Sequence, residues 1–177
     1  KHRKLKGIIC CGCLAERYRE QVFTELPEVD AVVGTGSIHN IVQAVEEVWK
    51  GRKYISCEKN ECLRLGGERV ITTPDYTAYI KIAEGCDNRC SYCAIPMIRG
   101  GFRSRPIEDL VAEAKELETL GVKELVIVAQ DTTRYGLDLY GEYSLARLLK
   151  ALTAETSIPW FRLLYCYPDK ITDELID

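Results

Sequence analysis

Three cysteines, Cys86, Cys90 and Cys93, are spaced C-x3-C-x2-C within the segment GCDNRCSYCAIP. Thiolates are soft ligands, and a group this compact suits an iron–sulfur cluster. Three protein ligands for a four-iron cube leave one iron with an open coordination position. Open positions distinguish catalytic from structural metal sites, because a substrate or cofactor can occupy them. The spacing therefore predicts a cluster that takes part in chemistry.

Two simpler interpretations of the same cysteines are a zinc knuckle and a ferredoxin-type electron carrier. A carrier needs a fourth local cysteine and usually has a C-x2-C-x2-C run, which is absent here. The next cysteine, Cys166, lies far along the chain beside Leu164 and Tyr165. It falls in a predicted strand, and we expect it to pack in the core as a small apolar residue.

The remaining cysteines do not form a disulfide framework. The chain has nine cysteines, an odd number, in tight groups and scattered positions, which favours metal over disulfides. Cys10 and Cys11 fall in a predicted buried strand and are expected to be apolar packing residues, with a substitute ligand as the alternative. Cys57 and Cys62 belong to the polar segment SCEKNEC, where free thiols are expected and a metal role is the alternative.

The composition of the chain argues against several classes of function. The 177 residues are 46% hydrophobic and carry a formal net charge of -3, so no general attraction to nucleic acid or anionic membrane is implied. No apolar run reaches the roughly 18 residues of a membrane span, and no signal-peptide pattern is present. We expect a cytoplasmic protein with no membrane partner. The chain begins at Lys1 and stops at Asp177 in a predicted helix, so a fragment of a longer protein is expected.

The first third of the chain reads as two strand–helix units. Apolar runs predict strands at residues 5–13 and 31–34, and helical spacing predicts helices over residues 15–26 and 41–51. This alternation predicts an open parallel sheet in an α/β domain. Residues 52–76 lose the periodicity and are predicted to connect two domains.

A second α/β series begins at Thr77. Its predicted strands and helices alternate over residues 78–85, 106–120, 124–130, 144–153 and 160–167, and a further helix starts at Ile171. Three successive βα units make half of a six-unit partial barrel. Active sites of such folds lie at the carboxyl ends of the strands, where the cysteine loop and the AQDTTRYG loop both fall.

The C-x3-C-x-aromatic-C pattern after a first barrel strand resembles the signature of the radical S-adenosylmethionine (SAM) superfamily. In that family the amino and carboxylate groups of SAM bind the open iron. One electron then cleaves SAM to methionine and a 5′-deoxyadenosyl radical. Tyr92, between the second and third ligands, matches the aromatic position that packs beside the adenine.

The flanking segments, AYIKIAEGCDNRCSYCAIPMIRG and RSRPIEDLVAEAKEL, resemble the methylthiotransferase branch of that superfamily. The resemblance identifies residues 1–70 as the later part of the N-terminal domain plus a linker. Residues 71–177 correspond to the first half of the radical SAM domain, a (βα)6 partial barrel. The segment GCLAERY is similar to the one that supplies the third ligand of an auxiliary cluster, which carries over to Cys13. The implied cofactors of the full-length protein are two 4Fe-4S clusters and SAM.

The segment VIVAQDTTRYG, residues 126–136, resembles the members that modify a small-subunit ribosomal protein. The implied reaction inserts a methylthio group at the β-carbon of an aspartate of ribosomal protein S twelve. A tRNA (adenosine) methylthiotransferase is the alternative within the family, and a non-catalytic iron–sulfur or zinc module is the alternative outside it. The expected partners are S twelve and a reductant such as flavodoxin or ferredoxin. The protein itself is expected to be a monomer. The fragment alone is expected to be incompetent for the full reaction.

Polar residues near the cysteine loop complete the predicted site. Gln130 and Asp131 follow the second strand, where superfamily members use polar side chains for the amino group of SAM; capping of the strand end is the alternative. Arg99, Arg103 and Arg105 form a basic run after the cysteines. They are expected either on a solvated face or in contact with the cofactor carboxylate or an acidic substrate.

Overall fold

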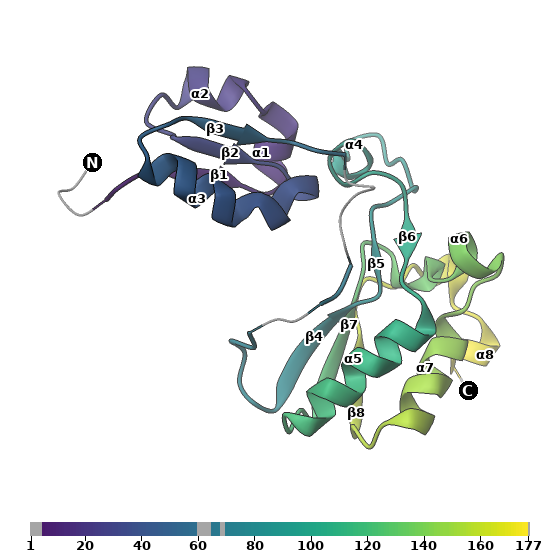
Figure 1. Ribbon diagram of the computed structural model, residues 1–177. Helices are drawn as coiled ribbons and strands as arrows, with labels where there is room; N and C mark the ends of the chain where they lie inside the picture. Colours follow the sequence, from purple (N-terminus) through teal and green to yellow (C-terminus); the bar gives the residue numbers. More distant parts are fainter. Residues whose placement is uncertain (1–4, 60–64, 68–69, 177) are drawn as a thin grey trace. The chain divides into compact units, whose positions relative to one another are not determined.

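The computed structural model describes residues 5–59, 65–67 and 70–176. The chain divides into two compact units. The first comprises residues 1–63 with Arg89–Gly100, and the second comprises Arg64–Asn88 with Gly101–Asp177. Each unit is described by itself (Figure 1). The division into family domains at residue 70 stays a prediction.

The first unit is built on a three-stranded parallel sheet in the order β1-β2-β3. Its helices cover both faces, with α3 on one side and α1 and α2 on the other (Figure 1). Alternate residues of the central strand serve the two faces, since Val32 packs with α1 and α2 while Ala31 and Val33 pack with α3. The elements are β1 (Ile9–Cys11), α1 (Cys13–Tyr18), α2 (Gln21–Glu25), β2 (Ala31–Val33), α3 (Ile41–Trp49) and β3 (Tyr54–Ser56).

Two sequence expectations for this unit were wrong. Strand β3 lies inside the stretch predicted to be a connection between domains, because three residues, of which Ile55 is exposed, are too few to show a periodic pattern. Strand β1 is shorter than the predicted 5–13 and is not uniformly buried, because it lies at the edge of the sheet. Cys10 packs against the core, whereas Cys11 is exposed. Cys62 lies outside the described residues.

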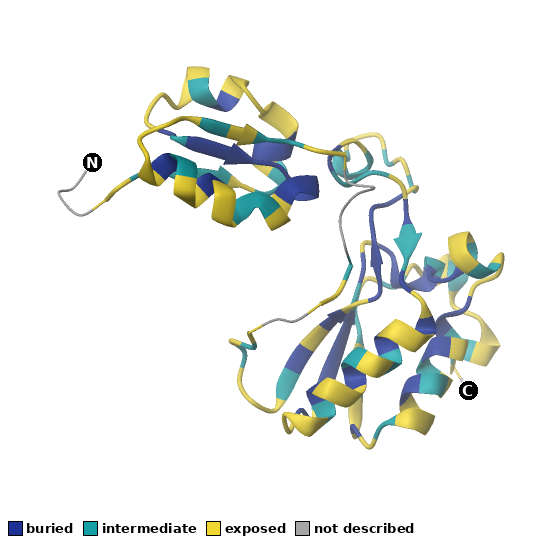
Figure 2. Ribbon diagram, in the orientation of Figure 1, coloured by how far each residue is buried: buried dark blue, intermediate teal, exposed yellow. Residues whose placement is uncertain are grey.

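The second unit contains another three-stranded parallel sheet, in the order β4-β7-β8. Helices α5 and α7 pack on one face, and the buried residues of both helices are shown in Figure 2. In β4, Ala78 and Ile80 are buried whereas Tyr79 is half exposed, the alternation expected when one face is covered. The elements are β4 (Thr77–Lys81), α5 (Ile107–Thr119), β7 (Glu124–Val128), α7 (Leu145–Glu155) and β8 (Trp160–Leu163).

Shorter elements lie between these. The predicted strand 78–85 is two strands, because β5 (Ala83–Glu84) leaves the main sheet and pairs antiparallel with β6 (Arg103–Ser104). Short helices are α4 (Ile95–Arg99) in the first unit and α6 (Leu137–Tyr140) and α8 (Asp173–Ile176) in the second. No helix among the described residues is long and apolar enough to cross a membrane.

The position of Cys166 differs from its prediction. Strand β8 ends at Leu163, so Cys166 lies in the following loop and is only partly buried. Its Sγ lies 3.3 Å from Oγ1 of Thr132. The aromatic and apolar run WFRLLYCY suggested a longer strand, but the backbone turns at Tyr165, which has a φ of 61°.

Candidate functional site

The carboxyl ends of β7 and β8 and the loop after β5 bring polar side chains together in the second unit. Parallel strands present their carboxyl ends at one edge of a sheet, where α/β proteins commonly bind ligands. Thr132 fastens two of these loops together, since its backbone N–H donates to the Tyr165 carbonyl at 3.1 Å and its hydroxyl donates to the Leu164 carbonyl at 2.9 Å. The loops therefore form a connected layer.

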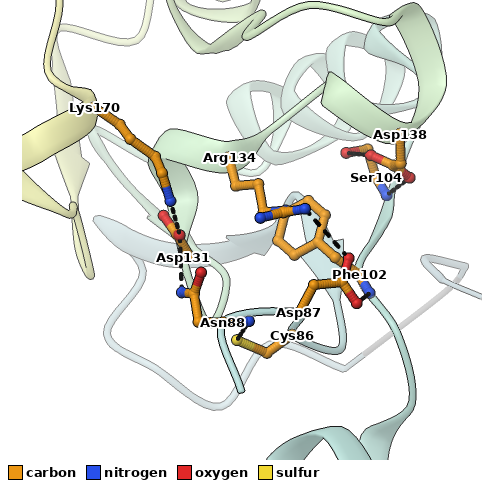
Figure 3. Close-up of polar contacts among 9 residues, drawn as sticks. All are labelled: Cys86, Asp87, Asn88, Phe102, Ser104, Asp131, Arg134, Asp138 and Lys170. Carbon is orange, nitrogen blue, oxygen red and sulfur yellow. Dashed lines mark hydrogen bonds and ion pairs between the residues drawn. The ribbon is translucent and has the colours of Figure 1, made fainter. Parts of the chain in front are cut away.

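Asp131 lies at the centre of this layer and has no exposed surface (Figure 3). Its Oδ1 accepts a hydrogen bond from Thr133 Oγ1 at 2.6 Å, and its Oδ2 accepts one from Asn88 Nδ2 at 3.1 Å. Lys170 Nζ lies 3.5 Å from the same Oδ2. Burial alone would raise the pKa of Asp131, but these hydrogen bonds and the lysine charge outweigh it and lower the pKa. The carboxylate is therefore ionised at neutral pH.

Cys86 is buried and begins the loop that carries the predicted cluster ligands. The backbone N–H of Asn88 donates to Cys86 Sγ at 3.5 Å. Asp87, between them, accepts a hydrogen bond from the Phe102 N–H at 3.2 Å and lies 3.5 Å from Arg134 Nη2 (Figure 3). Both residues that follow the cysteine are thus held by contacts with other segments of the unit.

A cavity of about 330 Å³ opens at the same edge of the sheet. Within it, Lys81 Nζ pairs with the buried carboxylate of Glu84 at 2.5 Å, while Gln130 is exposed. Its volume is at the lower end of the range of small-molecule sites, and its charged and amide groups suit a polar ligand. The lining residues are Lys81, Ala83, Glu84, Val128, Ala129, Gln130 and Tyr165.

The other predicted ligands belong to the first unit. Cys90 and Cys93 are partly buried, and the Cys93 N–H donates to the Cys90 carbonyl at 2.9 Å in a tight turn. Tyr92, between them, is 90% exposed. Cys13 is the first residue of α1, and the Arg99 guanidinium donates to Cys13 Sγ at 3.3 Å. This contact holds the Cys13 sulfur beside a positively charged group of the same unit.

The chemistry of these side chains fits an iron–sulfur cluster. All cysteines among the described residues are free thiols. However, no group of three or more His, Cys, Asp or Glu side chains in the described part of the chain is gathered closely enough to hold a metal ion. The ligand roles of Cys86, Cys90, Cys93 and Cys13 stay predictions, as do the SAM contacts of Tyr92, Gln130 and Asp131.

The predicted basic run separates into residues with different surroundings. Arg105 is buried, lies 2.6 Å from Glu113 and donates to the Lys81 carbonyl at 3.0 Å, so the expectation of a solvated face was wrong for it. Arg103 belongs to β6, and Arg99 contacts Cys13. The spacing of the arginines does not reveal that Arg105 forms an ion pair with Glu113 of helix α5.

The segment 126–136 is held internally. Thr132, Thr133 and Tyr135 are buried, and the Tyr135 hydroxyl donates to the Arg105 carbonyl at 2.6 Å. Burial raises the pKa of this phenol, so it remains a neutral donor. The sequence did not predict the hydrogen-bond partners of Asp131. The polar run QDTTR directly after an apolar strand nevertheless indicated a functional loop at this position.

Comparison with known proteins agrees with these features. The family model of the radical SAM superfamily matches residues 80–177. The protein named ribosomal protein uS12 methylthiotransferase RimO from Desulforamulus reducens is 52% identical over 177 residues, covering 98% of this chain and 39% of the relative. Proteins of the same name from Thermoanaerobacter sp. and Pelotomaculum thermopropionicum are 49% and 53% identical, covering 100% and 98% of this chain and 41% and 39% of the relatives. The chain thus spans about two fifths of these curated relatives.

Proposed function

This chain belongs to the radical SAM superfamily, and from that premise we propose that it is part of a methylthiotransferase that modifies ribosomal protein uS12. One observation carries the proposal: relatives of that name are 49–53% identical across both units of the chain. The cysteine spacing and the polar edge of the second unit support the same chemistry.

We propose that the thiolates of Cys86, Cys90 and Cys93 hold a 4Fe-4S cluster and leave its fourth iron open for SAM. A cluster held by these thiolates would provide one electron for the cleavage of SAM to methionine and a 5′-deoxyadenosyl radical. A radical is required because the β-carbon of an aspartate carries a proton too weakly acidic for a general base.

The chain's own side chains bind and orient SAM in this proposal. Gln130 offers its amide to the amino group of SAM from the rim of the cavity, and Asp131 adds negative charge behind it. The exposed ring of Tyr92 offers a face for the adenine. The cavity is lined by the Lys81–Glu84 ion pair and by the Gln130 amide, so its wall presents polar groups to a zwitterionic ligand.

The same proposal assigns Cys13 to an auxiliary 4Fe-4S cluster. The hydrogen bond from the Arg99 guanidinium supports this role, because it fixes the position of the Cys13 sulfur. In fold terms, residues 1–70 are then part of an open parallel-sheet domain, and residues 71–177 are the first half of a (βα)6 partial barrel. The three parallel strands of each unit support this assignment.

The proposed substrate is one aspartate of uS12, modified at its β-carbon by a monomeric enzyme. A low-potential carrier such as flavodoxin or ferredoxin is the proposed reductant. Since the proposed substrate is a ribosomal protein, the proposed place of action is the cytoplasm.

The radical step can be tested without the ribosomal substrate. The complete protein is reconstituted anaerobically with iron and sulfide, reduced with dithionite and incubated with SAM, and 5′-deoxyadenosine is measured by chromatography. We expect the product to depend on reductant and to be lost in Cys86→Ala. A protein that binds zinc but no sulfide, or one that carries the cluster and yields no 5′-deoxyadenosine, would overturn the proposal.

A further inference from the structure

Asn88 makes two different contacts at once in the second unit. Its backbone N–H donates to the buried sulfur of Cys86 at 3.5 Å, and its side-chain amide donates to Asp131 Oδ2 at 3.1 Å. The backbone contact depends on the orientation of the Asn88 peptide, and the side-chain contact restrains that orientation. Asn88 thus lies between Asp131 and the sulfur of Cys86 and contacts both (Figure 3).

Asp131 is well suited to serve as a fixed anchor. It has no exposed surface, and its two oxygens accept from Thr133 in its own loop, from Asn88 after β5 and from Lys170 after β8. A buried carboxylate is costly to move away from its donors, because charge-assisted hydrogen bonds compensate for its lost hydration. The side chain of Lys170 is itself only 18% exposed, so this ion pair is shielded from water.

Asp87, the residue before Asn88, also holds the loop that follows Cys86. Asp87 accepts from the Phe102 N–H at 3.2 Å and lies 3.5 Å from Arg134. Because Asp87 is exposed and its ion pair is long, we expect this contact to contribute less than the buried one. Asn88 and Asp131 therefore form the main restraint on the residue that contacts Cys86.

We propose that Asn88 and Asp131 are positioning residues, in which Asp131 holds the Asn88 amide so that the Asn88 N–H stays on the sulfur of Cys86. An N–H donor withdraws charge from a thiolate, and hydrogen bonds to cluster sulfurs change the reduction potential. Asn88 and Asp131 therefore raise the reduction potential of the cluster in the holoprotein. In the apoprotein they keep the Asn88 N–H on the free thiol of Cys86 and so slow its reaction with alkylating reagents. The statement about the cluster rests on the proposed function, whereas the statement about the free thiol does not.

The test compares three variants of the complete protein with the unmodified one. Asn88→Ala removes the amide tether and keeps the backbone N–H, while Asp131→Asn leaves only one oxygen for the donors. The double change Asn88→Asp with Asp131→Asn exchanges the two groups and can form the contact in reverse. Asp138→Asn is the matched control, because Asp138 lies in the same stretch of chain but accepts from Ser104 instead.

Two readouts separate positioning from a general loss of structure. Alkylation of Cys86 by iodoacetamide in the apoprotein is followed by peptide mass spectrometry, and the midpoint potential of the reconstituted cluster is measured by titration with EPR detection. We expect both single variants to alkylate about threefold to tenfold faster, the scale of one net hydrogen bond. We also expect a more negative cluster potential, with both values restored in the double variant and unchanged in the control.

The outcomes are decisive in either direction. Folded single variants with the alkylation rate and potential of the unmodified protein would overturn the inference, and so would single-variant defects that the exchange leaves unrepaired. If Asp131→Asn does not fold, Asn88→Ala still decides, because Asn88 is only partly buried. If the unmodified protein binds no cluster, the proposed function fails while the alkylation of Cys86 still tests the positioning.

Discussion

Asp131 has a buried carboxylate whose ionised form depends on donors from three loops. Burial opposes the charge, and the hydrogen bonds and Lys170 more than compensate, so the folded-state pKa lies below the unfolded one. A carboxyl with a lowered pKa stabilises the fold above its unfolded pKa and loses that contribution as the pH falls through its folded pKa.

The lowered pKa of Asp131 predicts how the stability of a variant depends on pH. We expect Asp131→Asn to be less stable than the unmodified chain at pH 7, and the difference to shrink below the unfolded aspartate pKa of about 3.9. Urea denaturation at a series of pH values measures it. A difference that stays constant or grows on acidification would contradict the ionised, hydrogen-bonded carboxylate.

The cysteines give a second prediction. We expect Cys86→Ala, Cys90→Ala and Cys93→Ala each to abolish reductive cleavage of SAM, because two thiolates hold a cube poorly and alter its potential. Cys166→Ala is the control and is expected to retain cleavage, because Cys166 lies outside the predicted ligand set and its sulfur contacts the Thr132 hydroxyl. Product analysis with 5′-deoxyadenosine as the readout decides it. Activity in all three ligand variants, or none in a folded Cys166 variant, argues against these assignments.

Sequence patterns identify candidate site residues better than they identify the residues that these contact. The spacing of Cys86, Cys90 and Cys93 is local and indicates a metal site without any structure. The contact between Asn88 and Asp131 joins residues 43 positions apart, and the contact between Arg99 and Cys13 joins residues 86 positions apart. Contacts of this kind depend on which strands are neighbours, and no local pattern reports that.

Elements differ in how strongly the sequence specifies them. The apolar runs of β2 and β7 and the amphipathic pattern of α5 were predicted because burial imposes a period on them. Strands β3 and β6 were not predicted, and β5 was joined with β4 into one predicted strand. Two or three residues show no period, and their pairing comes from the surrounding fold. Helix α5 begins one residue later than predicted, with Pro106 as its N-cap and Glu108 and Asp109 in its first turn.

Helix α7 allows a prediction at the same scale. Leu145, Leu148 and Leu152 are its buried residues and belong to the main core of the second unit. We expect Leu148→Ala to lower the free energy of unfolding by about 2–5 kcal/mol, since the lost contacts leave a cavity. Lys150→Ala is the control on the same helix; its exposed ion pair with Glu174 contributes about 0–1 kcal/mol. Chemical denaturation measures both, and equal effects would contradict the packing described for α7.

At the scale of the whole molecule, each unit repeats one design, a three-stranded parallel sheet with helices packed on it. The alternation of apolar strands and helices predicted this α/β class. The grouping of Arg89–Gly100 with the first unit was not predicted, because it depends on tertiary contacts such as that of the Thr35 hydroxyl with the Ile98 carbonyl at 3.3 Å. The chain spans about two fifths of its relatives, so the activity of the whole protein must be tested on the complete enzyme.

One measurement tests the proposed methylthiotransferase most directly. The complete, reconstituted protein is incubated with SAM and reductant in the presence of both uS12 and tRNA, and each is then analysed by mass spectrometry. We predict that one aspartate of uS12 gains the mass of a methylthio group in place of a hydrogen, and that the tRNA remains unmodified. The Cys86→Ala protein is the control and should leave both substrates unchanged. A methylthio group on tRNA, or an unmodified uS12 in a reaction that produces 5′-deoxyadenosine, would contradict the proposal.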